Sequence, residues 1–176
     1  MKFKLDYNFS INTDIFSFQF QPGNEKNATI RQTLGNATVY MPKNFEFSNQ
    51  LSQEWANKIL TNVLKEHGKI ILHNRTIRIA KEHNLGINRI CVKDISSRWG
   101  SCSSLKNVNL SIWLLLLPSH LIDYVVMHEL THLTHLNHSP QFWHSLDIMC
   151  GGAGKAKLLD KELDEFAKSL LTQRTS

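Results

Sequence analysis

Four residues in one short stretch have the types and spacing of a hydrolytic metal site: His128, Glu129, His132 and, six residues later, His138. Two histidines four residues apart on a helix lie on one face about a turn apart, so both rings can bind one ion. A glutamate directly after the first histidine lies beside that face and can hold water without being a ligand. This is the H-E-x-x-H pattern of zinc hydrolases, and it predicts Zn²⁺ as the cofactor.

The three histidines and the glutamate supply what zinc-dependent hydrolysis needs. A catalytic zinc ion keeps three protein ligands and one open position for water, whose pKa it lowers toward neutrality. We therefore expect His128, His132 and His138 to be the ligands. We expect Glu129 to act as general base and then general acid, taking a proton from metal-activated water and passing it to the leaving amine. The predicted substrate is a peptide or a protein.

Other side chains are alternatives for the third ligand on spacing alone. His135 lies three residues after His132, where helix geometry points it less favourably, and His144 lies further along the chain. The remaining alternatives are three carboxylates and one thiol, from Asp147, Glu162, Glu165 and Cys102. Three histidines already fill the protein's share of a catalytic site, which argues against the thiol.

Two features near the histidines bear on substrate binding. Arg98, in the loop over residues 96–103, is a candidate for stabilising an oxyanion or binding a substrate carboxylate, and it is equally suited to hydrogen-bonding its own loop. A strand expected over residues 108–113 either offers an edge to an extended peptide or is an ordinary core strand. Residues 151–155 resemble a phosphate loop, but Met149 replaces its first glycine and Ala156 its serine or threonine. We interpret them as a turn.

The first half of the chain must position these residues from outside the motif. Alternating apolar and polar residues predict a strand over residues 3–11 and another around Phe16, Phe18 and Phe20, with weaker strands over residues 28–33 and 37–41. After Pro42, apolar residues recur at three- and four-residue spacing. This pattern predicts one helix that ends at Gly68 and a second over residues 69–83.

The second half should carry the metal site on a helix. A strand is expected around Ile90 and Val92, and the motif falls in a mostly buried helix over residues 120–136 with Ser119 as its N-cap. A last helix over residues 157–171 should pack outside the core. The pattern predicts an α+β fold in a single domain, residues 1–176, with a strand-rich part (1–42) and a helical part holding the zinc site (43–176).

Composition limits the partners and the compartment. The net charge of +5 and pI near 9.2 permit a nucleic-acid partner, but the basic residues are scattered and fit a solvated surface better. The longest apolar run, residues 112–117, is too short to cross a membrane. Three cysteines without CxxC spacing, and an N-terminal stretch without the apolar core of a signal peptide, predict a cytoplasmic protein. The sequence does not set an oligomeric state.

Three segments together resemble one family. Residues 97–102 (Ser-Arg-Trp-Gly-Ser-Cys), residues 122–130 around the first histidine, and residues 137–143 (Asn-His-Ser-Pro-Gln-Phe-Trp) occur in the order found in the YgjP-like metallopeptidases. These are small zincins related to the SprT-like and WLM groups. The resemblance implies a compact zincin-like fold with a small sheet packed on the active-site helix. It also implies His128, His132 and His138 as ligands and Glu129 as the catalytic residue, which favours His138 over the alternatives.

Three other functions fit parts of the same pattern. A zinc endoribonuclease of the YbeY type shares the histidine spacing, but such enzymes typically lack the glutamate after the first histidine. A DNA-associated protease of the SprT-like kind has weak support from the basic pI. A binding module that keeps zinc for stability alone is disfavoured because Glu129 is present beside all three histidines.

Overall fold

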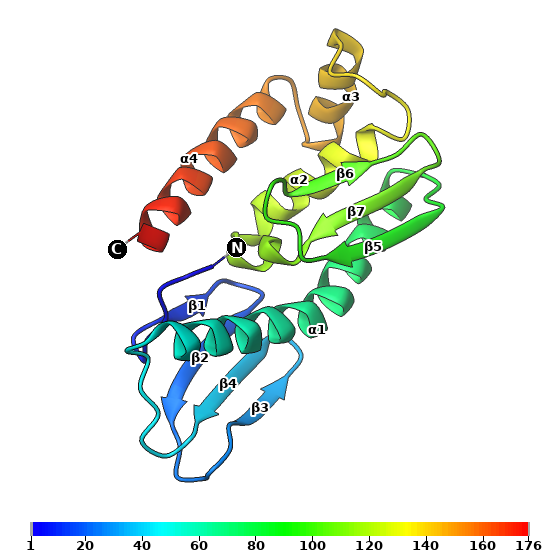
Figure 1. Cartoon of the computed structure of the whole chain (residues 1–176). Coiled ribbons are helices and arrows are strands. Elements are labelled where there is room, and N and C mark those ends of the chain that lie inside the picture. The colour runs from blue at the N-terminus through cyan, green and yellow to red at the C-terminus, as the bar shows by residue number, and fades with distance from the viewer. Residues whose placement is uncertain (1, 176) are drawn as a thin grey trace.

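The computed structural model describes residues 2–175, with side chains as far as residue 170. Within this range, two small sheets lie on opposite sides of one long helix (Figure 1). Of three further α-helices in this range, one packs on the second sheet, and the other two pack against that one. The predicted α+β class is confirmed. Of the helices in residues 2–175, none combines the length and apolar character needed to cross a bilayer.

The N-terminal sheet has the strand order β1-β2-β4-β3. Its strands are β1 (Ser10–Asn12), β2 (Ser17–Pro22), β3 (Thr29–Thr33) and β4 (Asn36–Met41). The two central strands, β2 and β4, run parallel, and each outer strand is antiparallel to its neighbour. Alternation places Phe18 and Phe20 on the buried face, as predicted, and the weaker strands also form within about a residue of their expected limits.

The predicted strand over residues 3–11 is wrong except at its end, where β1 begins. Phe3 and Leu5 are buried in alternation, yet their backbone N–H groups donate to side-chain oxygens of the long helix, Asn57 Oδ1 at 2.9 Å and Gln53 Oε1 at 2.8 Å. Side-chain amides thus replace a neighbouring strand. The alternating burial of a strand arises here without its ladder of backbone hydrogen bonds.

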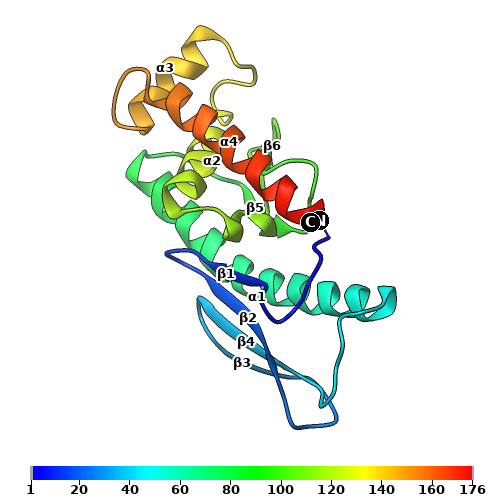
Figure 2. The same ribbon diagram turned by 90° about the vertical axis from the view of Figure 1, so that its left-hand side faces the viewer.

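The long helix, α1 (Gln50–Glu82), crosses the molecule between the two sheets (Figures 1 and 2). Asn49 caps it by accepting from the backbone N–H of Ser52. The prediction of two helices divided at Gly68 is wrong. A β-carbon at Gly68 would lie only 3.4 Å from Val92 and 3.7 Å from Leu115. The glycine therefore marks a close approach of the second sheet and does not end the helix.

The second sheet comprises β5 (Arg89–Lys93), β6 (Gly100–Cys102) and β7 (Asn107–Ser111), in the order β5-β7-β6. The central strand β7 pairs with β5 in parallel and with β6 in antiparallel orientation. The interpretation of residues 108–113 as a substrate edge is therefore wrong, because both sides of β7 are already paired. A buried 3-10 helix, η1 (Ile112–Leu116), follows.

Three helices complete the fold: α2 (Ser119–Thr131), α3 (Pro140–Met149) and α4 (Lys155–Thr175). Figure 2 shows α4 running alongside α2. The last helix was predicted, and so was the preceding turn, in which Gly151, Gly152 and Gly154 have positive φ. Buried apolar side chains from both sheets and all four helices form one cluster.

The start and end of α2 differ from the prediction. The N-cap is Pro118 instead of Ser119, and the N–H of Ser119 donates to Asp14 Oδ1 at 2.9 Å, so a residue far away in the sequence satisfies this helix end. The helix stops at Thr131, five residues early. There the backbone tightens, with Leu133 N–H donating to Leu130 O, and the chain turns back.

An ion pair ties α2 to α1. The carboxylate of Asp123 accepts from Arg75 through both oxygens, with Nη2 to Oδ2 at 2.9 Å, and Arg75 also donates to the carbonyl of Ser119 at 3.1 Å. A two-pronged guanidinium–carboxylate pair constrains direction as well as distance. It therefore fixes how the helix that carries His128 and Glu129 lies on the rest of the fold.

Candidate metal centre

The first two histidines of the motif lie at the C-terminal end of α2. His128 is in the last turn, and His132 is the C-cap, whose backbone remains in the right-handed helical region. Their ring centroids are 5.2 Å apart, as expected for positions one turn apart on one face. The early end of the helix therefore does not disturb the predicted pairing of these two rings.

The loop after α2 brings the third histidine back to this pair. His138 Nε2 lies 3.0 Å from His128 Nε2, and the ring centroids of His132 and His138 are 4.9 Å apart. One ligand nitrogen from each of the three rings lies within 4.8 Å of the other two. The end of α2 supplies His128 and His132, and the loop that follows supplies His138, so the three imidazoles lie together.

Hydrogen bonding selects the nitrogen that His132 presents. Its Nδ1 lies 2.9 Å from the carbonyl oxygen of His135. A carbonyl only accepts, so Nδ1 carries the proton and Nε2 keeps its lone pair. In metal sites, such a hydrogen bond from the ring nitrogen that does not bind the metal fixes the orientation of the histidine.

A buried aromatic ring supports all three histidines. Phe142 in α3 is 0% exposed, and its centroid lies 4.7–5.0 Å from those of His128, His132 and His138. Ser139 caps this helix by accepting from the N–H of Phe142 at 3.3 Å. Periodicity missed α3, although a serine followed by proline is a typical helix start. That signal was available in the sequence.

Burial favours the uncharged form of His128 and His132. Burial is the main reason that the pKa of His128 is lowered to about 4. Repulsion from a positive charge on His132 or His138 contributes less. Burial also lowers the pKa of His132, partly offset by its hydrogen bond to the carbonyl of His135. A metal binds the neutral imidazole, so this environment favours the ligand form near neutral pH.

Glu129 points into the protein beside the histidines and is 7% exposed. Burial raises the pKa of its carboxyl to about 7, and the positive charge of Arg98 opposes that rise. Arg98 itself is exposed on the loop before β6. The structure therefore brings Arg98 into electrostatic contact with the predicted catalytic carboxyl and leaves its guanidinium accessible from outside.

The alternative ligands have other partners. His135 Nε2 lies 2.9 Å from Ser145 Oγ, and Asp147 accepts from the backbone N–H groups of Gly154 and Ala156. Glu162 pairs with His120 and Glu165 with Lys161. For the thiol of Cys102, burial and the charge of Glu129 raise the pKa, which disfavours the thiolate that binds metals. Neither these residues nor His144 join the histidine group found in the described part of the chain.

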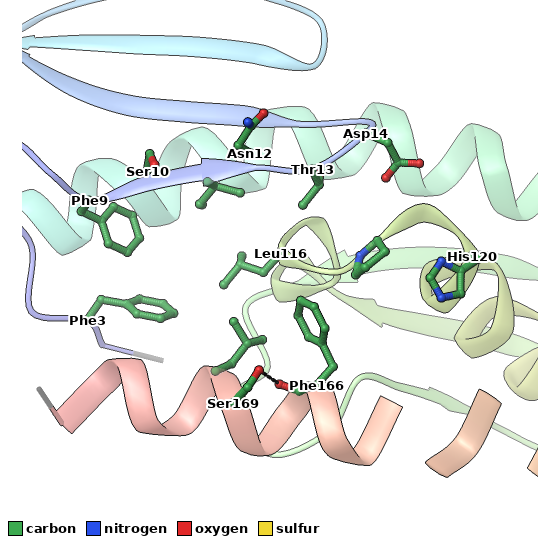
Figure 3. A pocket seen from close by; sticks show the side chains of 13 residues that line it. Phe3, Phe9, Ser10, Asn12, Thr13, Asp14, Leu116, His120, Phe166 and Ser169 are labelled. Atoms are coloured by element: carbon green, nitrogen blue, oxygen red, sulfur yellow. Dashed lines mark hydrogen bonds between the residues drawn. The ribbon is translucent and has the colours of Figure 1, made fainter. Parts of the chain in front are cut away.

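A separate cavity of about 600 Å³ lies between the N-terminal segment, the end of η1 and α4 (Figure 3). Phe3 and Phe9 line one side and Phe166 the other. Two of its polar groups already have partners, since Asp14 accepts from the N–H of Ser119 and His120 pairs with Glu162. None of the three clustered histidines lines this cavity, so it is separate from the candidate metal centre.

The fold and the histidine cluster define a mixed α+β protein with a candidate three-imidazole metal centre. The model of the YgjP-like metallopeptidase domain matches residues 17–165, and the chain belongs to this family. It is therefore a peptidase, a hydrolase whose family uses a metal ion.

Two solved structures are similar to parts of the chain. One is the metallopeptidase zymogen of Pyrococcus abyssi abylysin, at 18% identity and a TM-score of 0.47, covering 53% of this chain and 91% of that one. The other is the metallopeptidase zymogen of Methanocaldococcus jannaschii jannalysin, at 20% identity and a TM-score of 0.47, covering 55% and 96%. No curated protein matches.

Proposed function

We propose that the protein is a zinc-dependent peptidase in which His128, His132 and His138 hold the ion and Glu129 transfers the proton. The observation that carries this proposal is the convergence of three imidazoles from two elements beside one buried carboxyl. The family supplies the reaction class, and the side chains supply the roles.

The donor set fits a zinc ion. In a tetrahedral site with Zn–N bonds of about 2.0–2.1 Å, neighbouring nitrogens are about 3.3 Å apart. The Nε2 atoms of His128 and His138 are 3.0 Å apart, and His132 directs its free Nε2 toward the same group. When bound, zinc supplies a Lewis acid that makes water more acidic and polarises the carbonyl of the scissile bond.

We assign proton transfer, and not ligation, to Glu129. It neighbours His128 on α2, yet the three-imidazole group forms without it. In the proposed reaction, water oxygen bonds to the peptide carbonyl carbon while Glu129 accepts a water proton. Glu129 then delivers that proton to the amide nitrogen as the C–N bond breaks, which releases the amine and the new carboxyl group.

The outer strand β6 is the proposed binding edge for the substrate. It is paired only on the β7 side within its sheet, and it lies next to α2 (Figure 1). An extended peptide can pair with such an edge through its backbone, which gives affinity with little sequence dependence. Arg98, two residues before β6, is suited to bind a substrate carboxylate or the developing oxyanion.

We assign residues 1–176 to a single domain, which the shared apolar cluster of both sheets supports. We assign the protein to the cytoplasm, with support from three free cysteines, Cys91, Cys102 and Cys150, which suit a reducing compartment.

Substitution of Glu129 tests the mechanism. Glu129→Gln should keep about one equivalent of zinc by metal analysis and lose hydrolysis of an unfolded protein by about a thousandfold or more, because the amide cannot accept the proton. Glu165→Gln, which changes a carboxyl paired with Lys161 on α4, is the matched control and should remain active. Full activity of Glu129→Gln would remove this residue from the mechanism.

The substrate class is tested with the same pair of variants. Wild-type protein should hydrolyse unstructured polypeptide and leave single-stranded RNA and DNA intact. RNA cleavage that disappears in Glu129→Gln would instead identify an endoribonuclease. Polypeptide cleavage that requires added DNA, with binding that weakens steeply as salt rises, would identify a DNA-associated protease.

A further inference from the structure

Gly100, the first residue of β6, lies directly against the side chain of Glu129. A β-carbon added to Gly100 would be 2.7 Å from Glu129 Cγ, 2.8 Å from Oε1 and 3.0 Å from Cδ. Non-bonded carbon atoms are stable at about 3.5–4.0 Å. No side chain therefore fits at position 100 while Glu129 keeps this conformation.

The backbone gives no separate reason for glycine at this position. Positive φ is found at Gly35, Gly151, Gly152 and Gly154, and Gly100 is not among these glycines. It pairs with Leu110 in an ordinary antiparallel register. Glycine inside a strand is normally unfavourable, and it typically marks the close approach of another group. Here that group is the carboxyl-bearing side chain of Glu129.

Both sides of this contact are held in place. The strand is fixed because the N–H of Ser111 donates to the carbonyl of Trp99 at 2.8 Å, directly before Gly100. The backbone of Glu129 is fixed in α2, next to His128, and its side chain is 7% exposed. An added methyl group is therefore accommodated most easily by rotation of the Glu129 carboxyl, since neither backbone can retreat.

We propose that Gly100 is a positioning residue for Glu129: the missing side chain at this place in β6 sets where the carboxyl lies relative to the three histidines. This rests on the proton-transfer role proposed above for Glu129. The same strand then has two functions, because its outer edge binds substrate and its first residue makes room for the proton acceptor.

The test compares Gly100→Ala with Gly86→Ala. At Gly86 nothing lies within 4 Å of an added β-carbon, so this control makes the same chemical change in open space. Gly100→Ala should keep its zinc and its KM and lose about a hundredfold in kcat, because a small misplacement of a reacting group is that costly. Gly86→Ala should match wild type in all three. An unchanged kcat in Gly100→Ala overturns the proposal.

A second measurement separates positioning from general damage to the fold. Gly100→Ala should lower the melting temperature in the wild-type background and leave it unchanged in the Glu129→Ala background, where the space is open. If Gly100→Ala does not fold, the double variant should fold, and failure of the double variant overturns the proposal. Activity that survives in Glu129→Gln refutes the proposed function itself. Loss in Glu129→Gln with full activity in Gly100→Ala refutes only the inference about Gly100.

Discussion

His67 is a buried histidine and His128 a half-buried one, and they differ in the partners of their ring nitrogens. His67, on α1, is 4% exposed; its Nδ1 accepts from the N–H of Gly35 at 3.1 Å, and its Nε2 lies 3.2 Å from Gln32 Oε1. A backbone N–H only donates, so Nδ1 is unprotonated and Nε2–H donates to the amide oxygen. Both ring nitrogens of this histidine are matched by fixed partners from the N-terminal sheet.

His128 faces another imidazole instead of a fixed donor or acceptor. Its Nε2 lies 3.0 Å from Nε2 of His138, a distance at which both nitrogens can also bind one ion through their lone pairs. Burial lowers the pKa of both His67 and His128, so burial does not distinguish them. The two histidines are distinguished by the partner of Nε2, which is an amide oxygen for His67 and another imidazole for His128. A buried histidine satisfied by backbone and amide groups stabilises structure, whereas one aimed at other imidazoles is suited to a shared ion.

The largest expected difference between the two histidines is in activity. His128→Ala should lose its bound zinc and about a thousandfold or more in kcat/KM, because one of three ligands is removed. His67→Leu should keep zinc and activity at a temperature where it is folded. Metal analysis and peptide hydrolysis measure both, with His144→Ala as a control at an exposed histidine outside the cluster. Equal zinc content in His128→Ala and wild type would show that His128 is not a zinc ligand.

Removal of the metal should separate the two sites by stability. At free zinc about a hundredfold above Kd, binding to the folded state alone stabilises by about 2.7 kcal/mol. A chelator should therefore lower the melting temperature of wild type and of His67→Leu by a similar amount and leave His128→Ala unchanged. Differential scanning fluorimetry with and without chelator tests this. A melting temperature of His128→Ala that still responds to zinc would point to ligands elsewhere.

His67→Leu should act on folding alone. The substitution removes both hydrogen bonds of the ring and leaves the half-buried N–H of Gly35 without it as partner, at a cost of about 1–3 kcal/mol in the free energy of unfolding. Urea unfolding of the zinc-free protein measures the loss. A variant as stable as wild type would mean that these bonds contribute nothing net, and His67 would no longer serve as the structural reference.

The smallest expected effect is in the pH dependence of stability. Burial lowers the pKa of folded His67 below its usual value near 6.5, opposed by the negative charge of Glu66. As pH falls below about 6.5 the unfolded chain takes up this proton first, so the stabilising contribution is complete above that pH and declines below it, by at most about 1.4 kcal/mol per pH unit. The stability gap between wild type and His67→Leu should therefore narrow from pH 7.5 to pH 5.5. A constant gap would contradict the prediction.

Local patterns in the sequence predicted most of the elements, and non-local contacts explain the errors. The periodicity of α1 was clear, but Gly68 suggested an end because its packing beside Val92 of the second sheet is not visible in the sequence. Phe3 and Leu5 alternate in burial like strand residues because amides of α1 occupy their backbone groups. Neither fact is visible until the partner segments are placed beside each other.

The candidate site also has one part that local spacing predicts and another that depends on contacts between distant segments. Spacing alone predicts that His128 and His132 share a face, because both lie on one helix. Spacing made His138 one of several candidates for the third ligand, since a loop of unknown path joins it to the helix, and the resemblance to the family favoured it. Sequence reasoning could not find the contact between Gly100 and Glu129, because it depends on how closely β6 approaches α2.

The length of α1 has a consequence for the order of folding. Thirty-three residues of helix extend about 50 Å, and the N-terminal sheet, β5, η1 and α2 all attach along it. Segments such as residue 3 and residue 57 meet across 54 positions of chain, and such distant pairs are slow to find each other. Local hydrogen bonds allow the helix to form first, so each sheet can dock on a surface that already exists. We therefore expect the transition state for folding to contain α1, with either sheet free to join it next.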